Sequence, residues 1–199
     1  GVLPDRLPGR VAVDDNLGYA KHVNYAKTMR STYGADNVTL VDAGDAVQGK
    51  AMGTLTNGEY LIDIMNKCGY DFAIPGNHEF DYGMARAKAI IKEADFPYVS
   101  CNWVDLRTGL RVLPAVKLFP AGGKWIAFVG ITTPESFTKS TPAYFMNAKQ
   151  TKYIYDILGG DDGRKLYDAV QKAIDKAKAL GADIIIGLGH LGVDPSSSP

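Results

Sequence analysis

Two apolar runs that each end in a glycine-containing polar turn constrain the fold of this chain most. Val38–Val41 leads into the turn Asp42–Asp45, and Asp71–Pro75 leads into the turn Gly76–Asp81. Both runs have the composition of short buried strands, and glycine allows the chain to turn sharply where each strand ends. Between the turns, apolar residues recur at helical spacing from Gly58 to Lys67. The order strand, helix, strand predicts a β-α-β unit.

The ends of the predicted strands carry the polar residues of greatest interest. Because the two strands of a β-α-β unit are parallel, Asp45 and Asn77 are expected at the carboxyl edge of one sheet. A third strand is predicted at Ala182–Leu188, after an amphipathic helix, and His190 follows this strand directly. We therefore expect Asp45, Asn77 and His190 to face one crevice, with His78 beside them.

These residue types suit a metal site that cleaves phosphate esters. The two oxygens of a carboxylate such as that of Asp45 can span metal ions about 3.5–4 Å apart. The amide of Asn77 donates an oxygen without adding negative charge. An imidazole such as that of His78 can stabilise phosphate charge or protonate a leaving oxygen, and a neighbouring carboxylate would fix its tautomer and raise its basicity.

The turns resemble motifs of the calcineurin-like metallophosphoesterases, most closely the catalytic domain of the bacterial 5′-nucleotidase family. Asp42–Gly49 is similar to that family's G-D-x-x-Q-G-like stretch, and Gly76–Asp81 spells its G-N-H-E-F-D. Gly189–Gly192 resembles its later histidine loop. The resemblance extends over nearly the whole chain. It implies an α/β fold in which two sheets pack face to face as a sandwich flanked by helices, here incomplete.

By this resemblance Asp45 would bridge two divalent metal ions such as zinc or manganese, and Asn77 and His190 would bind one of them. His78 would reach the substrate phosphate, with Asp81 orienting its ring. The implied reaction is hydrolysis of nucleotide phosphate esters by a water that the two metals activate. The family is commonly exported, which implies an extracellular, cell-wall or periplasmic location.

Three alternatives stay open at this point. A 2′,3′-cyclic nucleotide phosphodiesterase or another phosphomonoesterase would use the same centre, and a non-catalytic scaffold or binding fragment would keep only the fold. Glu79 lies within the motif but is not assigned to the site, because its carboxylate would equally serve to hold the loop by hydrogen bonding.

Two motifs of the family do not occur in this chain. The family has an Asp-x-His at the end of its first strand and a Gly-His-x-His near the end of the domain. None of the histidines, His22, His78 and His190, completes either motif. We therefore expect residues 1–199 to be a single partial domain that looks cut at both ends, with an incomplete site and little or no activity. By resemblance, a C-terminal substrate-binding domain is expected in the parent protein.

Composition bounds the remaining possibilities. The chain has 199 residues, of which 46% are hydrophobic and 22% charged, and this suits one α/β core. Its 22 basic and 22 acidic residues balance, so a small nucleotide or phosphate ester is a better expected partner than a nucleic acid polymer.

Every apolar run is shorter than the roughly 18 residues that indicate a transmembrane helix. The cysteines, Cys68 and Cys101, lack metal-type spacing and are expected to be free thiols.

Two regions complete the sequence-based expectations. Strands are predicted at Pro97–Cys101, Val112–Phe119 and Trp125–Thr132, with Ala121–Gly123 as the turn of a hairpin between the last two. The segment Thr133–Gly163 is expected to be irregular. His22 lies on a predicted helix from about Leu17 to Tyr33, where we expect it at the surface or its boundary.

Overall fold

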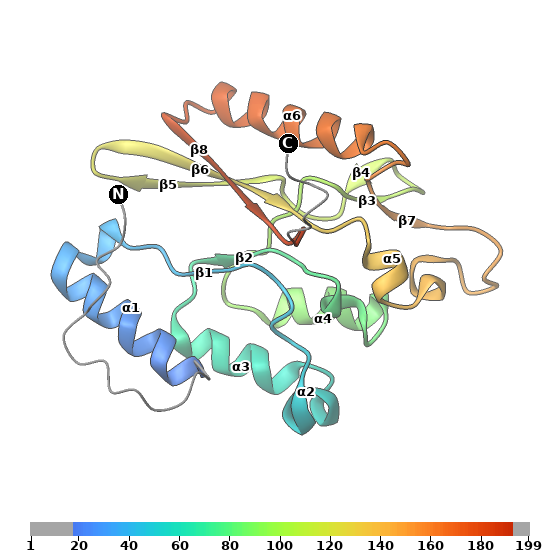
Figure 1. Ribbon diagram of the computed structural model, residues 1–199, viewed down its shortest axis with the longest axis horizontal. Coiled ribbons are helices and arrows are strands. Elements are labelled where there is room, and N and C mark those ends of the chain that lie inside the picture. Colours follow the sequence, from blue (N-terminus) through green and yellow to red (C-terminus); the bar gives the residue numbers. More distant parts are fainter. Residues whose placement is uncertain (1–17, 193–199) are drawn as a thin grey trace.

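Within residues 18–192, the part of the chain that the computed structural model describes, three small sheets form the frame of the molecule (Figure 1). In the first, β1 (Val41–Asp42) and β2 (Phe72–Ala73) are parallel. The second has the order β4 (Leu110–Arg111), β3 (Trp103–Asp105), β7 (Tyr155–Ile157), all antiparallel. In the third, β6 (Lys124–Ile131) pairs antiparallel with β5 (Val116–Ala121) and parallel with β8 (Ile184–Gly189).

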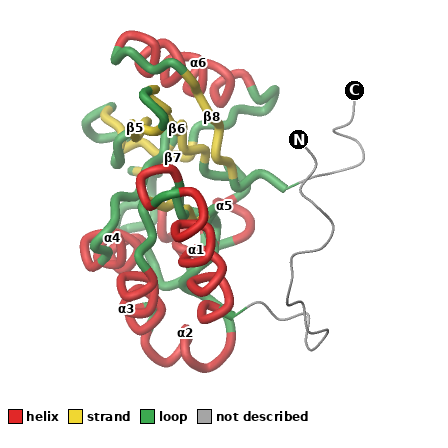
Figure 2. The backbone as a smooth tube through the Cα atoms, turned by 90° about the vertical axis from the view of Figure 1, so that its left-hand side faces the viewer, coloured by secondary structure: helices red, strands yellow, loops and turns green. Residues whose placement is uncertain are grey.

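Helices cover the outer faces of this frame. Helix α6 (Arg164–Ala179) lies over the β5-β6-β8 sheet (Figure 2). Helices α1 (Tyr19–Tyr33), α3 (Glu59–Cys68) and α4 (Met84–Glu93) lie on the side of β1 and β2 that faces away from this sheet (Figure 1). The shorter elements are α2 (Lys50–Thr56), α5 (Ser136–Lys139) and the 3₁₀ turns Ala35–Asn37, His78–Phe80 and Pro142–Phe145. None of the helices in the described range is long and apolar enough to cross a membrane.

The predicted β-α-β unit is present, with shorter strands than expected. Val41 pairs with Phe72 in a parallel ladder, and the backbone bonds from Asp71 N to Leu40 O (2.8 Å) and from Ile74 N to Asp42 O (3.1 Å) extend it at both ends. The connection between the strands holds α2 as well as the expected α3. Helix α2 was not predicted.

The position of β8 shows which sheet leads to His190. We expected Asp45 and Asn77 at the carboxyl edge of one sheet and His190 also at a carboxyl edge facing them, and β8 pairs with β6 in the other sheet of the sandwich. Buried Phe72 and Ile74 of the first sheet pack against Phe128 of the second, and the Phe72 and Phe128 ring centroids are 4.8 Å apart. The strand ends therefore meet across the sandwich and not along a single sheet.

The β5-β6 hairpin is confirmed. Its final pair joins Ala121 to Lys124, and Gly122 and Gly123 have φ of +57° and +73°. Glycine adopts this pair of left-handed conformations without strain, and a two-residue hairpin turn favours it for this reason.

The prediction of a strand at Pro97–Cys101 was wrong in its extent. It is reduced to an isolated bridge between Tyr98 and Ala73, and pairing resumes in β3. The segment 133–163 was expected to be irregular, but it contains α5 and the strand β7.

His22 is exposed on α1, and Cys68 and Cys101 are free thiols, both as expected.

Candidate functional site

The carboxylate of Asp45 lies at the centre of the candidate site, where three loops meet. One oxygen, Oδ1, accepts a hydrogen bond from the backbone N–H of His78 at 2.8 Å. The other, Oδ2, lies 3.0 Å from Nε2 of His190. A single side chain after β1 therefore contacts both the loop after β2 and the loop after β8.

The ring of His190 is oriented by its second nitrogen. Nδ1 lies 2.8 Å from the carbonyl oxygen of Ala43, so Nδ1 must carry a proton and donate it to this bond. In the neutral ring, Nε2 is then an acceptor, and it faces the acceptor Oδ2 of Asp45 at 3.0 Å. Two acceptors at this distance repel each other unless a proton or a metal cation lies between them. Imidazole nitrogen and carboxylate oxygen are ligands that zinc and manganese accept.

Asn77 lies between Gly76 and His78 in the chain and is partly buried. The bonds that fix the neighbouring backbone are those of Gly76 N to Glu79 and of His78 N to Asp45. No hydrogen bond of the Asn77 amide occurs with any residue between 18 and 192. Its side-chain oxygen is therefore available to a ligand.

His78 and Asp81 form a close pair, with Nδ1 and Oδ2 only 2.5 Å apart. Burial of the His78 ring lowers its pKa, but the hydrogen bond to Asp81 and the charge of Asp45 outweigh this and raise the pKa overall. The side chain of His78 remains 38% exposed, so a substrate can reach it. Because Asp81 occupies Nδ1, the other ring nitrogen is left for the substrate.

Glu79 is a site-forming residue that the sequence analysis did not assign. Its carboxylate is 1% exposed and accepts three backbone hydrogen bonds, from Asp45 N (2.9 Å), Ala46 N (2.9 Å) and Gly76 N (2.6 Å). Burial raises its pKa to about 7, although these bonds act in the opposite direction. One buried carboxylate thus fixes the two motif turns to each other. The available signal was its spacing of three residues from Gly76, which is typical of glutamates that bond back to a turn.

Glycine allows the two turns to touch. A Cβ on Gly44 would overlap the backbone of Gly76, and a Cβ on Gly76 would overlap the carboxylate of Asp45. Gly44 has φ of +96°, and Asp45 itself has φ of +66°, a conformation that costs a non-glycine residue free energy. The backbone of the turn is strained at the residue that makes the central contacts.

The acidic character of the site favours a cation. Asp42 accepts a bond from Gly44 N at 2.8 Å, and burial, together with the charge of Asp45, raises its pKa to about 6. The residues of the candidate site nevertheless supply only part of the ligands that a metal ion needs. Among residues 18–192 no group of three or more His, Cys, Asp or Glu side chains is arranged to hold an ion. Asp45 and His190, with the amide of Asn77, form an incomplete ligand set.

Comparisons with known proteins agree with this geometry. The family model described as calcineurin-like phosphoesterase matches residues 19–198. The chain is 29% identical over 181 residues to a snake venom 5′-nucleotidase of Gloydius brevicauda, covering 88% of this chain and 28% of the relative. It is 33% identical over 177 residues to the 5′-nucleotidase of Homo sapiens, covering 85% of this chain and 28% of the relative.

A solved structure shows the same architecture. The 5′-nucleotidase precursor from Thermus thermophilus superposes with a TM-score of 0.69 at 29% identity, over 88% of this chain and 32% of that one. The chain thus spans less than a third of the length of these relatives. Calcineurin-like phosphoesterases use divalent metals, and the 5′-nucleotidases among them are hydrolases. From the matched family model and the sandwich that brings Asp45, Asn77, His78 and His190 together, this chain belongs to the calcineurin-like phosphoesterase family.

Proposed function

We propose that this chain carries part of the active site of an enzyme that hydrolyses nucleotide phosphate esters. The observation that carries the proposal is the contact of the Asp45 carboxylate with both the His78 loop and His190. The similarity to 5′-nucleotidases supports nucleotides as the substrate class. Asp45, Asn77 and His190 would hold divalent metal, zinc or manganese, of which the full centre would contain two ions. When bound, these ions supply Lewis acidity and lower the pKa of water.

In this proposal the remaining residues have separate tasks. His78 binds the substrate phosphate and transfers a proton to the leaving oxygen, through the ring nitrogen that does not contact Asp81. Asp81 fixes the tautomer and orientation of His78, at the Nδ1 to Oδ2 distance of 2.5 Å. Glu79 and the glycines keep the turns in register. Positioned proton transfer of this kind contributes about 10²- to 10⁴-fold to rate.

We also propose that the remaining metal ligands and the substrate-binding domain come from a longer protein. The relatives are more than three times the length of the aligned region, and the ligand set within residues 18–192 is incomplete. The 199-residue chain alone would then have little or no phosphatase activity. An extracellular, cell-wall or periplasmic location is supported by the venom relatives. A small nucleotide or phosphate ester, and no nucleic acid polymer, remains the proposed partner.

The test compares the chain with a longer form of the protein. Both are assayed with a chromogenic phosphate ester, a nucleoside 5′-monophosphate and a 2′,3′-cyclic nucleotide in excess manganese or zinc, and bound metal is measured in parallel. We expect the longer form to bind two ions and to prefer the 5′-monophosphate. Preference for the cyclic substrate would favour the phosphodiesterase alternative. Metal binding without turnover of any substrate would favour a binding protein. Robust turnover by the 199-residue chain would contradict the partial site.

A further inference from the structure

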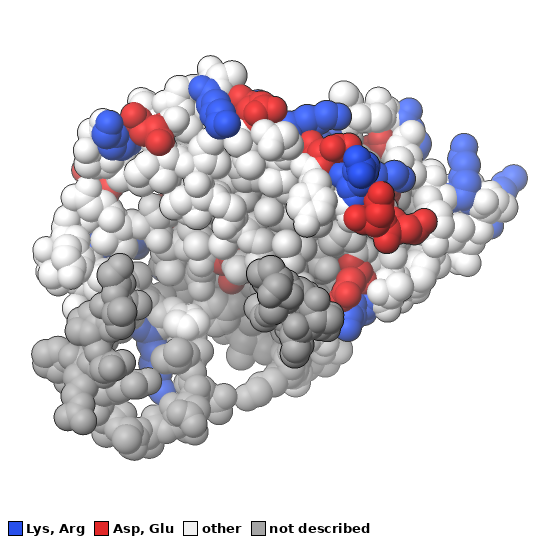
Figure 3. Space-filling model, turned by 45° about the horizontal axis from the view of Figure 1, so that its top comes forward, with Lys and Arg blue, Asp and Glu red and all other residues white. Residues whose placement is uncertain are grey.

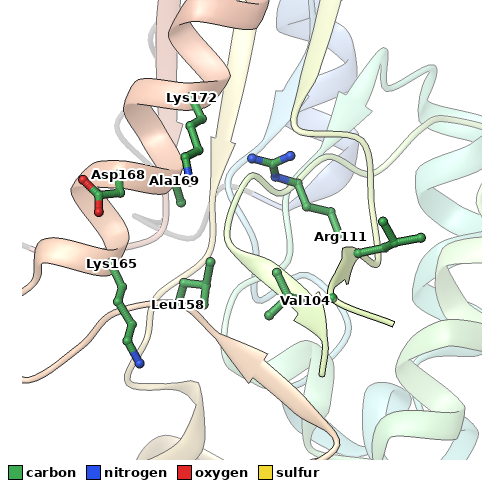
Figure 4. Close-up of a pocket in the computed structure, with 9 residues that line it drawn as sticks. Val104, Arg111, Leu158, Lys165, Asp168, Ala169 and Lys172 are labelled. Atoms are coloured by element: carbon green, nitrogen blue, oxygen red, sulfur yellow. The ribbon is translucent and has the colours of Figure 1, made fainter. Parts of the chain in front are cut away.

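A cavity lies between α6 and the antiparallel strands β3 and β4, and none of the candidate-site residues lines it (Figure 4). Its volume is about 410 Å³. Val104 and Ala169 are buried and Leu158 is partly buried, and together they give the cavity an apolar wall. A cavity of this size lies within the range of about 300–1,000 Å³ that small-molecule sites occupy.

The charged residues of this cavity are unbalanced. Arg111, Lys165 and Lys172 line it with a single acidic residue, Asp168. None of these four side chains forms an ion pair with any residue of the described range. In Figure 4, Arg111 extends from β4 towards α6, whereas the carboxylate of Asp168 points away from the cavity. The cavity therefore has excess positive charge, although the face seen in Figure 3 carries Lys, Arg, Asp and Glu side chains interspersed.

Arg111 is held in place for binding. Its Nε donates a hydrogen bond to the carbonyl oxygen of buried Cys101 at 2.8 Å. This bond fixes the plane of the guanidinium and leaves its terminal N–H groups free to donate elsewhere. A guanidinium fixed in this way binds a phosphate oxygen pair with little further loss of conformational entropy. Lys172, on the facing side of the cavity, is exposed and supplies a second, adjustable charge.

We propose that this cavity binds a small phosphorylated molecule, with its phosphate between Arg111 and Lys172 and its apolar part against Val104, Leu158 and Ala169. The match is one of charge and shape: an anion neutralises cations that lack counter-ions, and the apolar wall accepts a ring or short chain. The site uses no residue of the metal centre. It is therefore independent of the proposed catalytic function and goes beyond it.

The test is an NMR titration of the ¹⁵N-labelled chain in EDTA with phenylphosphonate, inorganic phosphate and phenol. Phenylphosphonate cannot be hydrolysed, and EDTA removes the metal centre from the comparison. We expect saturable shifts at the amides of Arg111, Leu158 and Ala169, tighter binding of phenylphosphonate than of inorganic phosphate, and no response to phenol. Added salt should weaken binding, because the charges at the cavity are screened.

Three variants separate the cavity from general surface charge. Lys172→Gln should weaken phenylphosphonate binding by about five- to tenfold, whereas Lys176→Gln, one turn further along the exposed face of α6, should leave it unchanged. Asp168→Asn should strengthen binding by about two- to fivefold, because it removes the acidic residue that lines the cavity within residues 18–192. All three residues are exposed, so folding is retained, which the amide spectrum checks directly.

Several results would overturn the proposal. One is the absence of saturable shifts at the cavity up to about 10 mM phenylphosphonate. Another is an equal loss in Lys172→Gln and Lys176→Gln, which would indicate attraction by the whole surface. Shifts confined to Asp45 and His78 would place the anion at the candidate catalytic site. The proposed hydrolysis is unaffected by any of these outcomes, because the titration contains no metal.

Discussion

Nε2 of His190 faces Oδ2 of Asp45 at 3.0 Å while the other ring nitrogen of His190 is committed to the Ala43 carbonyl. The bond at Nδ1 fixes the tautomer, so the neutral ring presents a lone pair to a carboxylate. A cation between the two atoms converts this repulsion into two ligand bonds. The pair is therefore a natural first contact for a divalent ion.

The first prediction concerns metal binding by the chain. We expect the chain to bind a single zinc ion, and Asp45→Ala to abolish the binding. His190→Ala should weaken it by at least about tenfold, equivalent to about 1.4 kcal/mol. Equilibrium dialysis with metal analysis measures both effects. His22→Ala, at an exposed position on α1, is the matched control and should bind zinc as the unaltered chain does. Equal loss in the His22 and His190 variants would contradict the site.

The second prediction concerns Glu79. Glu79→Gln replaces one acceptor oxygen by an N–H₂ group. At least one of the three hydrogen bonds is then lost, because the new N–H₂ group and a backbone N–H are both donors and repel each other. We expect a loss of about 2–4 kcal/mol in the free energy of unfolding, measured by urea denaturation. Glu59→Gln is the control: Glu59 is exposed at the start of α3 and should change stability by less than about 0.5 kcal/mol. A stability loss below about 1 kcal/mol for Glu79→Gln would show that the Glu79 carboxylate does not hold the two motif turns together.

The third prediction separates two reasons for glycine at position 44. Gly44 has a positive φ and also touches the backbone of Gly76, whereas Gly181 has a φ of +86° and open space where a Cβ would lie. Gly181→Ala should therefore cost about 1 kcal/mol, from backbone strain alone. Gly44→Ala should cost about 2–4 kcal/mol and weaken metal binding, because the turns must move apart. Similar stability losses in the two variants would show that the contact between the turns is unimportant.

The fourth prediction concerns catalysis by the longer, active form. His78→Ala should lower kcat by about 10²- to 10⁴-fold with little change in bound metal, because His78 acts on the transition state and not on the ions. Asp81→Asn should have a smaller effect of the same kind, since it only releases the ring. Steady-state kinetics at saturating metal measures kcat and KM separately. Unchanged turnover by His78→Ala would exclude the role in proton transfer.

The fifth prediction is an unusual pH dependence of stability in the metal-free chain. Folding raises the pKa of Asp42 to about 6 and that of Glu79 to about 7, and it also raises the pKa of His78. A group with a raised pKa stabilises the fold below its ordinary value, and this contribution is lost as pH rises through the raised value. The free energy of unfolding should therefore fall between about pH 4 and pH 7 in EDTA, and Asp42→Asn should reduce the slope. A flat or rising profile would contradict these shifts.

Local chemistry was sufficient to predict the β-α-β unit and the glycine hairpin, whereas the pairing of His78 with Asp81 was expected from the family resemblance. Each depends on residues close in the chain or on a connection of fixed handedness. The sheet that holds β8 was not predictable in this way, because an apolar strand such as Ile184–Gly189 suits either layer of a sandwich. The role of Glu79 was predicted only in part. A bond within its own loop was expected, but the bonds from Asp45 N and Ala46 N come from residues more than thirty positions earlier. Long-range hydrogen bonds of this kind leave no local pattern.

The aromatic layer between the sheets acts as a spacer for the candidate site. Asp45 follows a strand of one sheet and His190 a strand of the other, so the gap between their head groups is set by the thickness of the Phe72, Phe119 and Phe128 packing. Aligned sheets pack roughly 10 Å apart, and the size of the intervening side chains adjusts this value. Core substitutions far from Asp45 and His190 would therefore change the separation of these two side chains, and with it the metal radius that the proposed site would accept.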